Sequence, residues 1–227
     1  MLKIYKITII LILVILPFSS KAHVQHYDDL NLIEFDIFRN NKHIGTHIFS
    51  FKKLEGQLAV ESEINFEIKK LGIVFYKYHV KGTEIYKAGR LIKFNSKTNQ
   101  NGKHKYVNLK LEGGEYTIDG SSYKGKAPED YLLGTWWNHS IIKATAQISA
   151  VSGRIIKQKV TFLGKETIKF GDKSYNSLHY NFSSTDKKLD KEKKLNTDVW
   201  YDEKTLNWIK ASFKKKGKSE YRLVLIE

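Results

Sequence analysis

Two adjacent tryptophans followed by an amide and an imidazole form the group best suited to chemistry: Trp136, Trp137, Asn138 and His139. Indole rings stack on sugars, lipids and aromatic ligands, and the amide and the imidazole can add hydrogen bonds. Adjacent residues of an extended backbone point to opposite faces, so one indole should enter the core while the other lies at its mouth. Two interpretations are open: the rings close the end of a β-barrel, or they contact a ligand.

A second group lies near the C-terminus, where Asp198, Trp200 and Asp202 share one face of a predicted strand. At the usual rise per residue the two carboxylates lie about 13 Å apart, whereas a paired acid and base on a glycosidase must lie within about 9.5 Å. We therefore expect Asp202 to start a turn. Asp198 and Trp200 are candidate ligand contacts, and a salt bridge from Asp198 to a lysine is the alternative.

Other catalytic and metal-binding patterns are missing from the sequence. It has no cysteine and no G-x-S-x-G elbow, which excludes thiolate enzymes and hydrolases built on that elbow. Its eight histidines show no metal-binding spacing, although an amino-terminal His23 would be able to chelate copper. We predict no catalytic residue, no metal and no cofactor, and we rank a hydrolase or a copper protein last.

The first residues predict export. Met1–Lys6 carries two lysines, Ile7–Leu16 is almost wholly apolar, and small residues precede Ala22. This pattern is typical of a secretory signal peptide, and its apolar run is shorter than the roughly 20 residues that span a bilayer. The sequence thus predicts a signal peptide at 1–22, cleaved after Ala22, and one β-barrel-like periplasmic domain at 23–227.

Charge restricts the partners of the protein. The formal charge of the chain is +15, and the predicted signal peptide holds three lysines and no acid, so the exported protein would carry +12. Such a protein suits anionic lipid headgroups or an acidic polymer, with simple lysine abundance as the alternative. Export and the lack of a recognisable motif argue against nucleic acid. The sequence leaves the oligomeric state open.

The rest of the chain has the pattern of short strands separated by turns. Apolar and polar residues alternate most clearly over Leu58–Lys69, which predicts a strand with one buried and one wet face. Asn40-Asn41 and Asn101-Gly102 are hairpin turn signals, and Gly82 suggests a bulge. Further strands are expected at 32–38, 44–51, 74–86, 91–98, 105–111, 116–118, 156–162, 167–170, 175–182, 195–201, 206–213 and 220–226.

About a dozen short strands predict an all-β fold, in which an antiparallel meander forms a barrel or a strongly curved half-barrel. Ser140 is expected to cap one short helix near 138–146, which is too small to cover a sheet. A two-sheet sandwich is the alternative. A barrel of eight to twelve strands would be wide enough to hold a ligand.

Several segments resemble the exported bacterial domain-of-unknown-function family 6134: 35–51, 98–102, 137–138 and 198–202. The resemblance covers nearly the whole exported chain and implies a signal peptide and a largely β fold, with no established activity. A more distant architectural likeness is to the curved half-barrels of periplasmic lipoprotein carriers and related lipid-binding proteins. The lack of cysteine rules out the lipid-anchored members.

We therefore expect a soluble periplasmic protein that binds an apolar or amphipathic molecule, such as a lipid, in a β-barrel cavity. Residues 136–139 would line its mouth, and basic residues at Lys214–Lys218 would approach an anionic membrane. The alternative is a filled-barrel structural or interaction protein of the cell envelope. The sequence favours neither catalysis nor any particular enzyme class.

Overall fold

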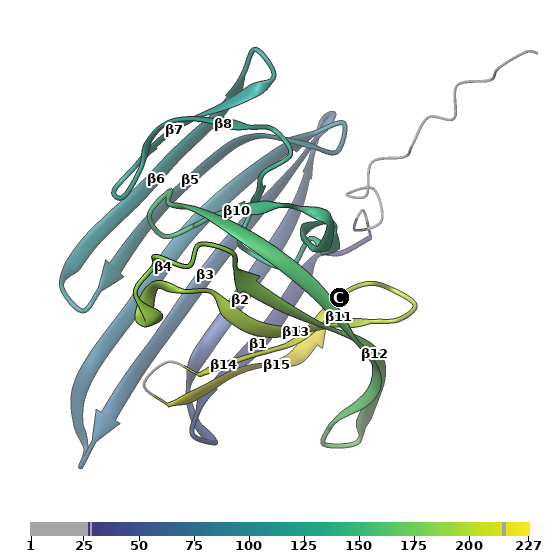
Figure 1. Cartoon of the computed structure of the whole chain (residues 1–227). Coiled ribbons are helices and arrows are strands. Elements are labelled where there is room, and N and C mark those ends of the chain that lie inside the picture. The colour runs from purple at the N-terminus through teal and green to yellow at the C-terminus, as the bar shows by residue number, and fades with distance from the viewer. Residues whose placement is uncertain (1–26, 28, 215–216) are drawn as a thin grey trace, which may run out of the picture.

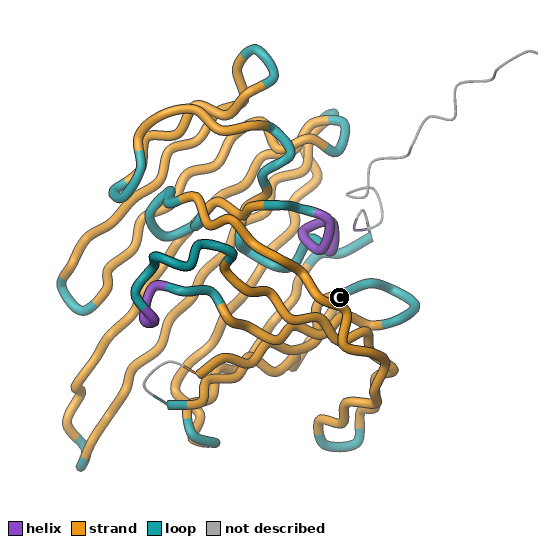
Figure 2. The backbone as a smooth tube through the Cα atoms, in the orientation of Figure 1, coloured by secondary structure: helices purple, strands orange, loops and turns teal. Residues whose placement is uncertain are grey.

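A computed structural model describes residue 27, residues 29–214 and residues 217–227, without the side chain of Lys191. The predicted signal peptide and His23 lie outside these residues. Among the described residues no helix is long and apolar enough to cross a bilayer. Strands make up most of the chain, as Figure 2 shows.

Fifteen strands form a single sheet. In chain order they are β1 (Leu32–Arg39), β2 (Lys42–Leu54), β3 (Gln57–Lys70), β4 (Ile73–Lys87), β5 (Arg90–Gln100), β6 (Lys103–Glu112), β7 (Glu115–Gly120), β8 (Lys124–Pro128), β9 (Leu132–Leu133), β10 (Ala146–Ile148), β11 (Ile155–Phe170), β12 (Lys173–Ser184), β13 (Asn196–Asp202), β14 (Trp208–Lys214) and β15 (Lys218–Ile226). Their order in the sheet is β8-β7-β6-β5-β4-β3-β2-β1-β15-β14-β13-β12-β11-β10-β9.

The sheet curls on itself without closing. Neighbouring strands are antiparallel, except that β9 pairs with β10 in parallel. In Figure 1 the strands β10–β13 cross in front of β3–β6, so the sheet makes two layers. In the described part of the chain, β8 and β9 end the sheet without pairing to each other. The predicted all-β meander and curved half-barrel are confirmed.

Local sequence explains most of the strands. In β3 the side chains of Leu58 and Val60 are buried, and Glu61 between the inward positions is exposed, as alternation predicts. The expected hairpin turns are also present. Asn40 and Asn41 have φ values of 47° and 63°, in the left-handed region that asparagine tolerates better than other side chains.

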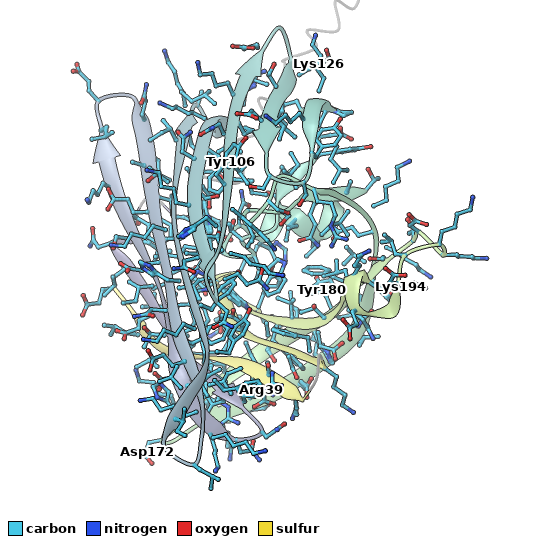
Figure 3. All side chains as sticks on the ribbon, turned by 90° about the vertical axis from the view of Figure 1, so that its left-hand side faces the viewer. Arg39, Tyr106, Lys126, Asp172, Tyr180 and Lys194 are labelled. Carbon is cyan, nitrogen blue, oxygen red and sulfur yellow. The ribbon has the colours of Figure 1, made fainter. Side chains whose placement is uncertain are left out.

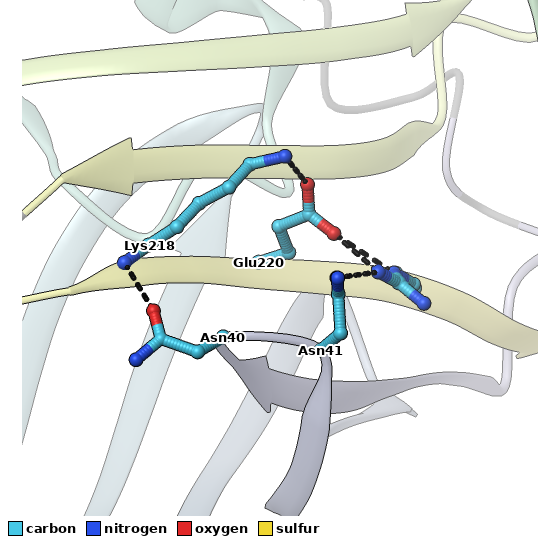
Figure 4. A network of polar contacts seen from close by, with 5 residues as sticks. Asn40, Asn41, Lys218 and Glu220 are labelled. Carbon is cyan, nitrogen blue, oxygen red and sulfur yellow. Dashed lines mark hydrogen bonds and ion pairs between the residues drawn. The ribbon is translucent and has the colours of Figure 1, made fainter.

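The β1–β2 hairpin is attached to β15 by an ion-pair network around the buried carboxylate of Glu220 (Figure 4). The carboxylate of Glu220 accepts from Lys218 Nζ at 2.6 Å and from Arg222 Nη2 at 2.5 Å. Arg222 also reaches Asn41 Oδ1 at 3.3 Å, and the Lys218 amide donates to Asn40 Oδ1 at 2.9 Å. Although burial favours the protonated acid, the cations of Lys218, Arg222 and Lys210 hold the pKa of Glu220 below its usual value.

The predicted bulge at Gly82 was wrong. Gly82 lies in an unbroken ladder opposite Ser62 and Ser96, and the register of β4 against β5 shifts instead between Ile85 and Tyr86. The ring of Phe94 explains the glycine, because a Cβ at this position would lie 3.1 Å from that ring. The residue allows close packing and leaves the ladder regular.

The predicted short helix is a 3-10 helix over His139–Lys143, and its cap differs from the expected one. Asn138 precedes the helix, and its Oδ1 accepts from the Ser140 amide at 3.0 Å. Ser140 is therefore the capped residue, not the cap. Figure 2 shows this helix as a single purple turn beside the strands.

The core fills the space between the two layers at one end of the half-barrel. The largest fully buried side chains include Trp137, Trp208 and Tyr27. Tyr27 packs edge-to-face on Trp137 with ring centroids 5.2 Å apart. Figure 3, a side view, shows side chains from both layers in this space, with the ring of Tyr180 directed into it. We call this region the closed end of the half-barrel.

Candidate functional site

Trp137 belongs to the closed end. Its ring is fully buried, and its Nε1 donates to Glu84 Oε1 at 3.0 Å. The Tyr86 hydroxyl donates to the other oxygen of Glu84 at 2.5 Å. Burial raises the pKa of Glu84 to about 6, although hydrogen bonds from Tyr86, Trp137 and Thr135 oppose the rise. In this geometry Trp137 acts as a packing residue with a polar anchor.

Sequence reasoning missed Glu84 and Tyr86, although one signal was present. The alternation of β4 puts Val80, Gly82, Glu84 and Tyr86 on the inward face. A carboxylate at an inward position is rarely buried unless it has partners. Such a residue in an otherwise apolar series predicts a buried polar network. Its partner Trp137 lies 53 residues away in the sequence and was not predictable from local pattern.

The neighbours of Trp137 are also held in the closed end. Trp136 has a left-handed backbone with φ of 61°, and its ring meets Trp208 edge-to-face at 5.7 Å. Its carbonyl accepts from the Tyr201 hydroxyl at 2.9 Å. His139 is buried, and its ring packs edge-to-face on Tyr201 at 4.8 Å. Four predicted ligand contacts thus lie together, in a packed environment.

A small pocket of about 150 Å³ lies beside this segment. Tyr86, Tyr116 and Asn138 are among its walls. Arg90, another wall residue, makes a two-pronged ion pair with Glu129, with both N···O distances at 2.6 Å. Pockets that enclose drug-sized ligands usually measure roughly 300–1,000 Å³. This pocket has room for water or a molecule of a few atoms, and it is too small for a lipid.

Trp200 lies on the opposite face of the sheet from the closed end. Val199 and Tyr201 point into the core, and Trp200 between them points outward, as alternation predicts. The ring of His179 stacks on Trp200 with centroids 4.1 Å apart and planes 17° apart, and Lys210 Nζ lies 4.6 Å from the ring centre. Trp200 is therefore already covered by its own neighbours.

Asp198 lies on this same outward face, and its partners are not the predicted lysine. Asn181 Nδ2 donates to Asp198 at 2.9 Å, and His179 Nε2 lies 3.6 Å away. His179 Nδ1 also contacts Glu166 at 2.9 Å, so the imidazole sits between two carboxylates. Within residues 29–214 and 217–227 there is no group of three or more His, Asp or Glu able to hold a metal. The two groups of candidate residues do not form one site.

The concave face carries a second set of aromatic side chains, which we call the aromatic face: Phe66 on β3, Tyr76 and Tyr78 on β4, and Tyr221 on β15. All four are partly exposed. Phe66 lies opposite Tyr78 in the ladder, and their rings stack with centroids 4.9 Å apart. In Figure 1 the β10–β13 layer does not cover the lower part of β3 and β4. This end of the half-barrel is open.

The phenol groups of Tyr76, Tyr78 and Tyr221 lie near enough to influence one another electrostatically. Burial raises the pKa of Tyr78, and the neighbouring phenols of Tyr221 and Tyr76 raise it further. Each phenol hydroxyl can donate and accept hydrogen bonds. The aromatic face therefore combines apolar ring area with phenol hydroxyl groups. The alternation of Val74, Tyr76, Tyr78 and Val80 was visible in the sequence, but nothing in it showed which end of the strands stays uncovered.

His47 lies between the closed end and the aromatic face. Its ring centroid is 5.9 Å from that of Trp208 and 5.7 Å from that of Tyr221. Burial lowers the pKa of His47 to about 3, so the ring is neutral at physiological pH. Its Nδ1 has no hydrogen-bond partner among the described residues. The packed aromatic core is thus continuous with the aromatic face, and the residue that joins them, His47, is uncharged.

The sequence of the chain matches a known family over residues 35–226, described as domain of unknown function (DUF6134). The chain belongs to this family. The half-barrel of this DUF6134 protein is similar to a crystal structure described as a beta-barrel-like protein of domain of unknown function DUF1849 from Brucella abortus. The TM-score is 0.61 at 11% identity, covering 87% of this chain and 97% of that chain. At that identity the likeness shows the fold alone. No curated protein matches the DUF6134 chain.

Proposed function

We propose that this DUF6134 protein is an exported, periplasmic binding protein that holds an apolar or amphipathic molecule, such as a lipid, on its aromatic face. The observation that carries the proposal is the partly exposed Phe66–Tyr78 stack on the concave side of the sheet. The outward positions of the same strand carry Glu63 and Glu67. The inward side chains of β3 thus remain apolar beyond the part of the strand that packs against the core of the protein.

Burial of that surface by a ligand would be favourable. Removing apolar area from water is worth roughly 25 cal/mol per Å², and an aromatic ring offers a large area. Tyr76, Tyr78 and Tyr221 would supply hydrogen bonds to the polar end of an amphipathic molecule. The proposal places the ligand on the open surface, because the interior around Trp137 and Trp208 is filled by side chains. The proposed export rests on the signal-peptide pattern of residues 1–22.

The packed closed end supports a second candidate, a structural or interaction protein of the envelope. Trp137 and Trp208 fill the interior at the closed end, as expected for a protein whose half-barrel has a structural role. In that case a protein partner would cover the aromatic face and no small molecule would be needed. The two candidates differ in what binds Phe66 and Tyr78, and one titration separates them.

The test is a fluorescence titration with a dansyl-labelled fatty acid, without membranes. We expect saturable binding by the wild type and at least tenfold weaker binding by the Phe66→Thr/Tyr78→Thr variant, in which threonine preserves strand propensity. Tyr106→Thr is the matched control, because Tyr106 is a partly buried aromatic residue on the outer face of β6. Equal affinity in all three proteins, or no binding by the wild type, would reject the aromatic face as a lipid site.

A further inference from the structure

The β3–β4 hairpin extends beyond both neighbouring strands. β2 pairs with β3 only as far as Phe66, and β5 pairs with β4 only from Tyr78 onward. The β3–β4 ladder continues past these residues to Lys70 and Ile73. Residues 67–77, which we call the hairpin tip, therefore form a free two-stranded ribbon about 13 Å long at the usual rise per residue. Figure 1 shows it projecting at the lower left of the sheet.

Large apolar side chains gather on the hairpin tip. Leu71 is 94% exposed, Ile73 73% and Phe75 76%. Single exposed apolar residues are common on protein surfaces, but a contiguous group marks an interaction site. A two-stranded ribbon without further cover is also marginally stable in water. We therefore expect a partner molecule or a membrane to cover the apolar side chains of the hairpin tip.

The turn at the end of the ribbon reinforces this inference. Leu71 has φ of 50° and Gly72 has φ of 79°, so both adopt the left-handed conformation. Leucine is disfavoured there, because its Cβ crowds the backbone. The turns at Asn40-Asn41 and Asn101-Gly102 place asparagine in this conformation, whereas Ala88 and Leu206 adopt it without asparagine or glycine. The chain thus holds a leucine at the end of the ribbon despite an unfavourable backbone.

Lysines stand directly behind the apolar end. Lys69, Lys70 and Lys77 are all exposed, and the hairpin tip holds one acid, Glu67. Glu67 lies 3.5 Å from Lys69 Nζ and 3.2 Å from Lys77 Nζ, which leaves a net positive charge on the ribbon. Elements that lie in a membrane interface have this arrangement, with apolar groups at the acyl boundary and lysines at the anionic headgroups.

We propose that the hairpin tip docks this protein onto an anionic bilayer surface, with Leu71, Ile73 and Phe75 inserted below the headgroups. Charge complementarity selects this partner over an uncharged apolar surface. The sequence pointed to Lys214–Lys218 for membrane contact. That turn joins β14 to β15 at the same end of the sheet as the β1–β2 turn, and residues 215–216 lie outside the described structure. The docking proposal stands independently of any ligand on the aromatic face.

The experiment is cosedimentation of the exported chain with vesicles. We expect binding to vesicles of phosphatidylglycerol and phosphatidylethanolamine, weaker binding to phosphatidylcholine, and a loss of at least tenfold in the Leu71→Asn/Ile73→Thr/Phe75→Thr variant. Asparagine suits the left-handed turn, so Leu71→Asn should not unfold the hairpin. Leu54→Asn is the matched control, because Leu54 is 51% exposed at the end of β2, beside the β2–β3 turn at the other end of β3 from the hairpin tip. It should bind like the wild type.

In the vesicle experiment, three outcomes would overturn the proposal: no binding of the wild type to anionic vesicles, unchanged binding by the triple variant, or an equal loss in Leu54→Asn. Sedimentation equilibrium without lipid tests the rival occupant. Self-association abolished by Leu71→Asn would assign the hairpin tip to a second copy of the chain and reject membrane docking. The triple variant should still bind dansyl fatty acid in solution, so a failure of docking is distinguishable from a failure of the aromatic face.

Discussion

Trp137 and Glu84 are joined inside the core by a hydrogen bond of 3.0 Å from the indole Nε1 to Oε1. Both side chains are fully buried, and they come from segments 53 residues apart. The bond attaches the segment before the 3-10 helix to the inward face of β4. It also keeps a carboxyl group inside the protein, where burial raises its pKa.

Glu84 should make the protein less stable as the pH rises. Its pKa is raised from 4.5 to about 6, so between these values the folded state binds more protons than the unfolded state and the free energy of unfolding falls with rising pH. At pH 7 the cost is about 2 kcal/mol, from 1.4 kcal/mol per pKa unit. Glu84→Gln keeps hydrogen-bonding groups for Trp137 and Tyr86. We expect urea denaturation to show it about 2 kcal/mol more stable at pH 7 and closer to wild type at pH 4.

His47 should have the opposite effect on acid stability. Its pKa is lowered from 6.5 to about 3, so between these values the unfolded state binds more protons and the free energy of unfolding falls as the pH drops. His47→Leu removes this titration and places an apolar side chain among aromatic rings. The free energy of unfolding of the variant minus that of the wild type should be roughly 2 kcal/mol larger at pH 5 than at pH 7.5. An unchanged pH slope in denaturant titrations would contradict the neutral, buried imidazole.

The Trp137–Glu84 bond should be measurable as a coupling energy. Trp137→Phe removes the indole donor and leaves a buried carboxyl oxygen without that partner, at a cost of roughly 2–4 kcal/mol. In a double-mutant cycle with Glu84→Leu, which has no acceptor for the indole, the coupling should fall within about 0.5–3 kcal/mol. Additive effects of the two substitutions would show that the bond contributes little. Trp200→Phe, on the outer face, serves as the comparison for ring loss outside the core.

Much of the fold was predictable from sequence. In a strand with one buried face, the alternation of apolar and polar residues identifies the inward side chains without information from distant segments. Leu58–Lys69 and the Asn40-Asn41 turn needed no distant information. Two predicted strands, 156–162 and 167–170, are one strand, β11, whose register against β12 shifts between Phe162 and Gly164. The short strands β8 and β9 were missed. Their residues lack clear alternation, and their pairing depends on distant partners.

The candidate site was less predictable than the fold. The sequence pointed to Trp136–His139 as unusual, and the structure gathers those residues in a packed closed end. It could not show that Asp198 and Trp200 lie on the other face of the sheet, because which face becomes concave depends on the curvature of all fifteen strands. The aromatic face escaped notice for the same reason. Phe66 and Tyr78 have the pattern of ordinary core residues, and only the three-dimensional arrangement leaves them partly exposed.

Native mass spectrometry of the protein purified from the periplasm tests the central claim most directly. The aromatic face predicts that the wild type and Tyr106→Thr carry a bound apolar or amphipathic molecule, seen as a mass increment that collisional activation removes. The Phe66→Thr/Tyr78→Thr variant should show the bare chain mass, with a circular dichroism spectrum like that of the wild type. A bare wild type, or the same increment in the variant, would contradict ligand binding at this surface.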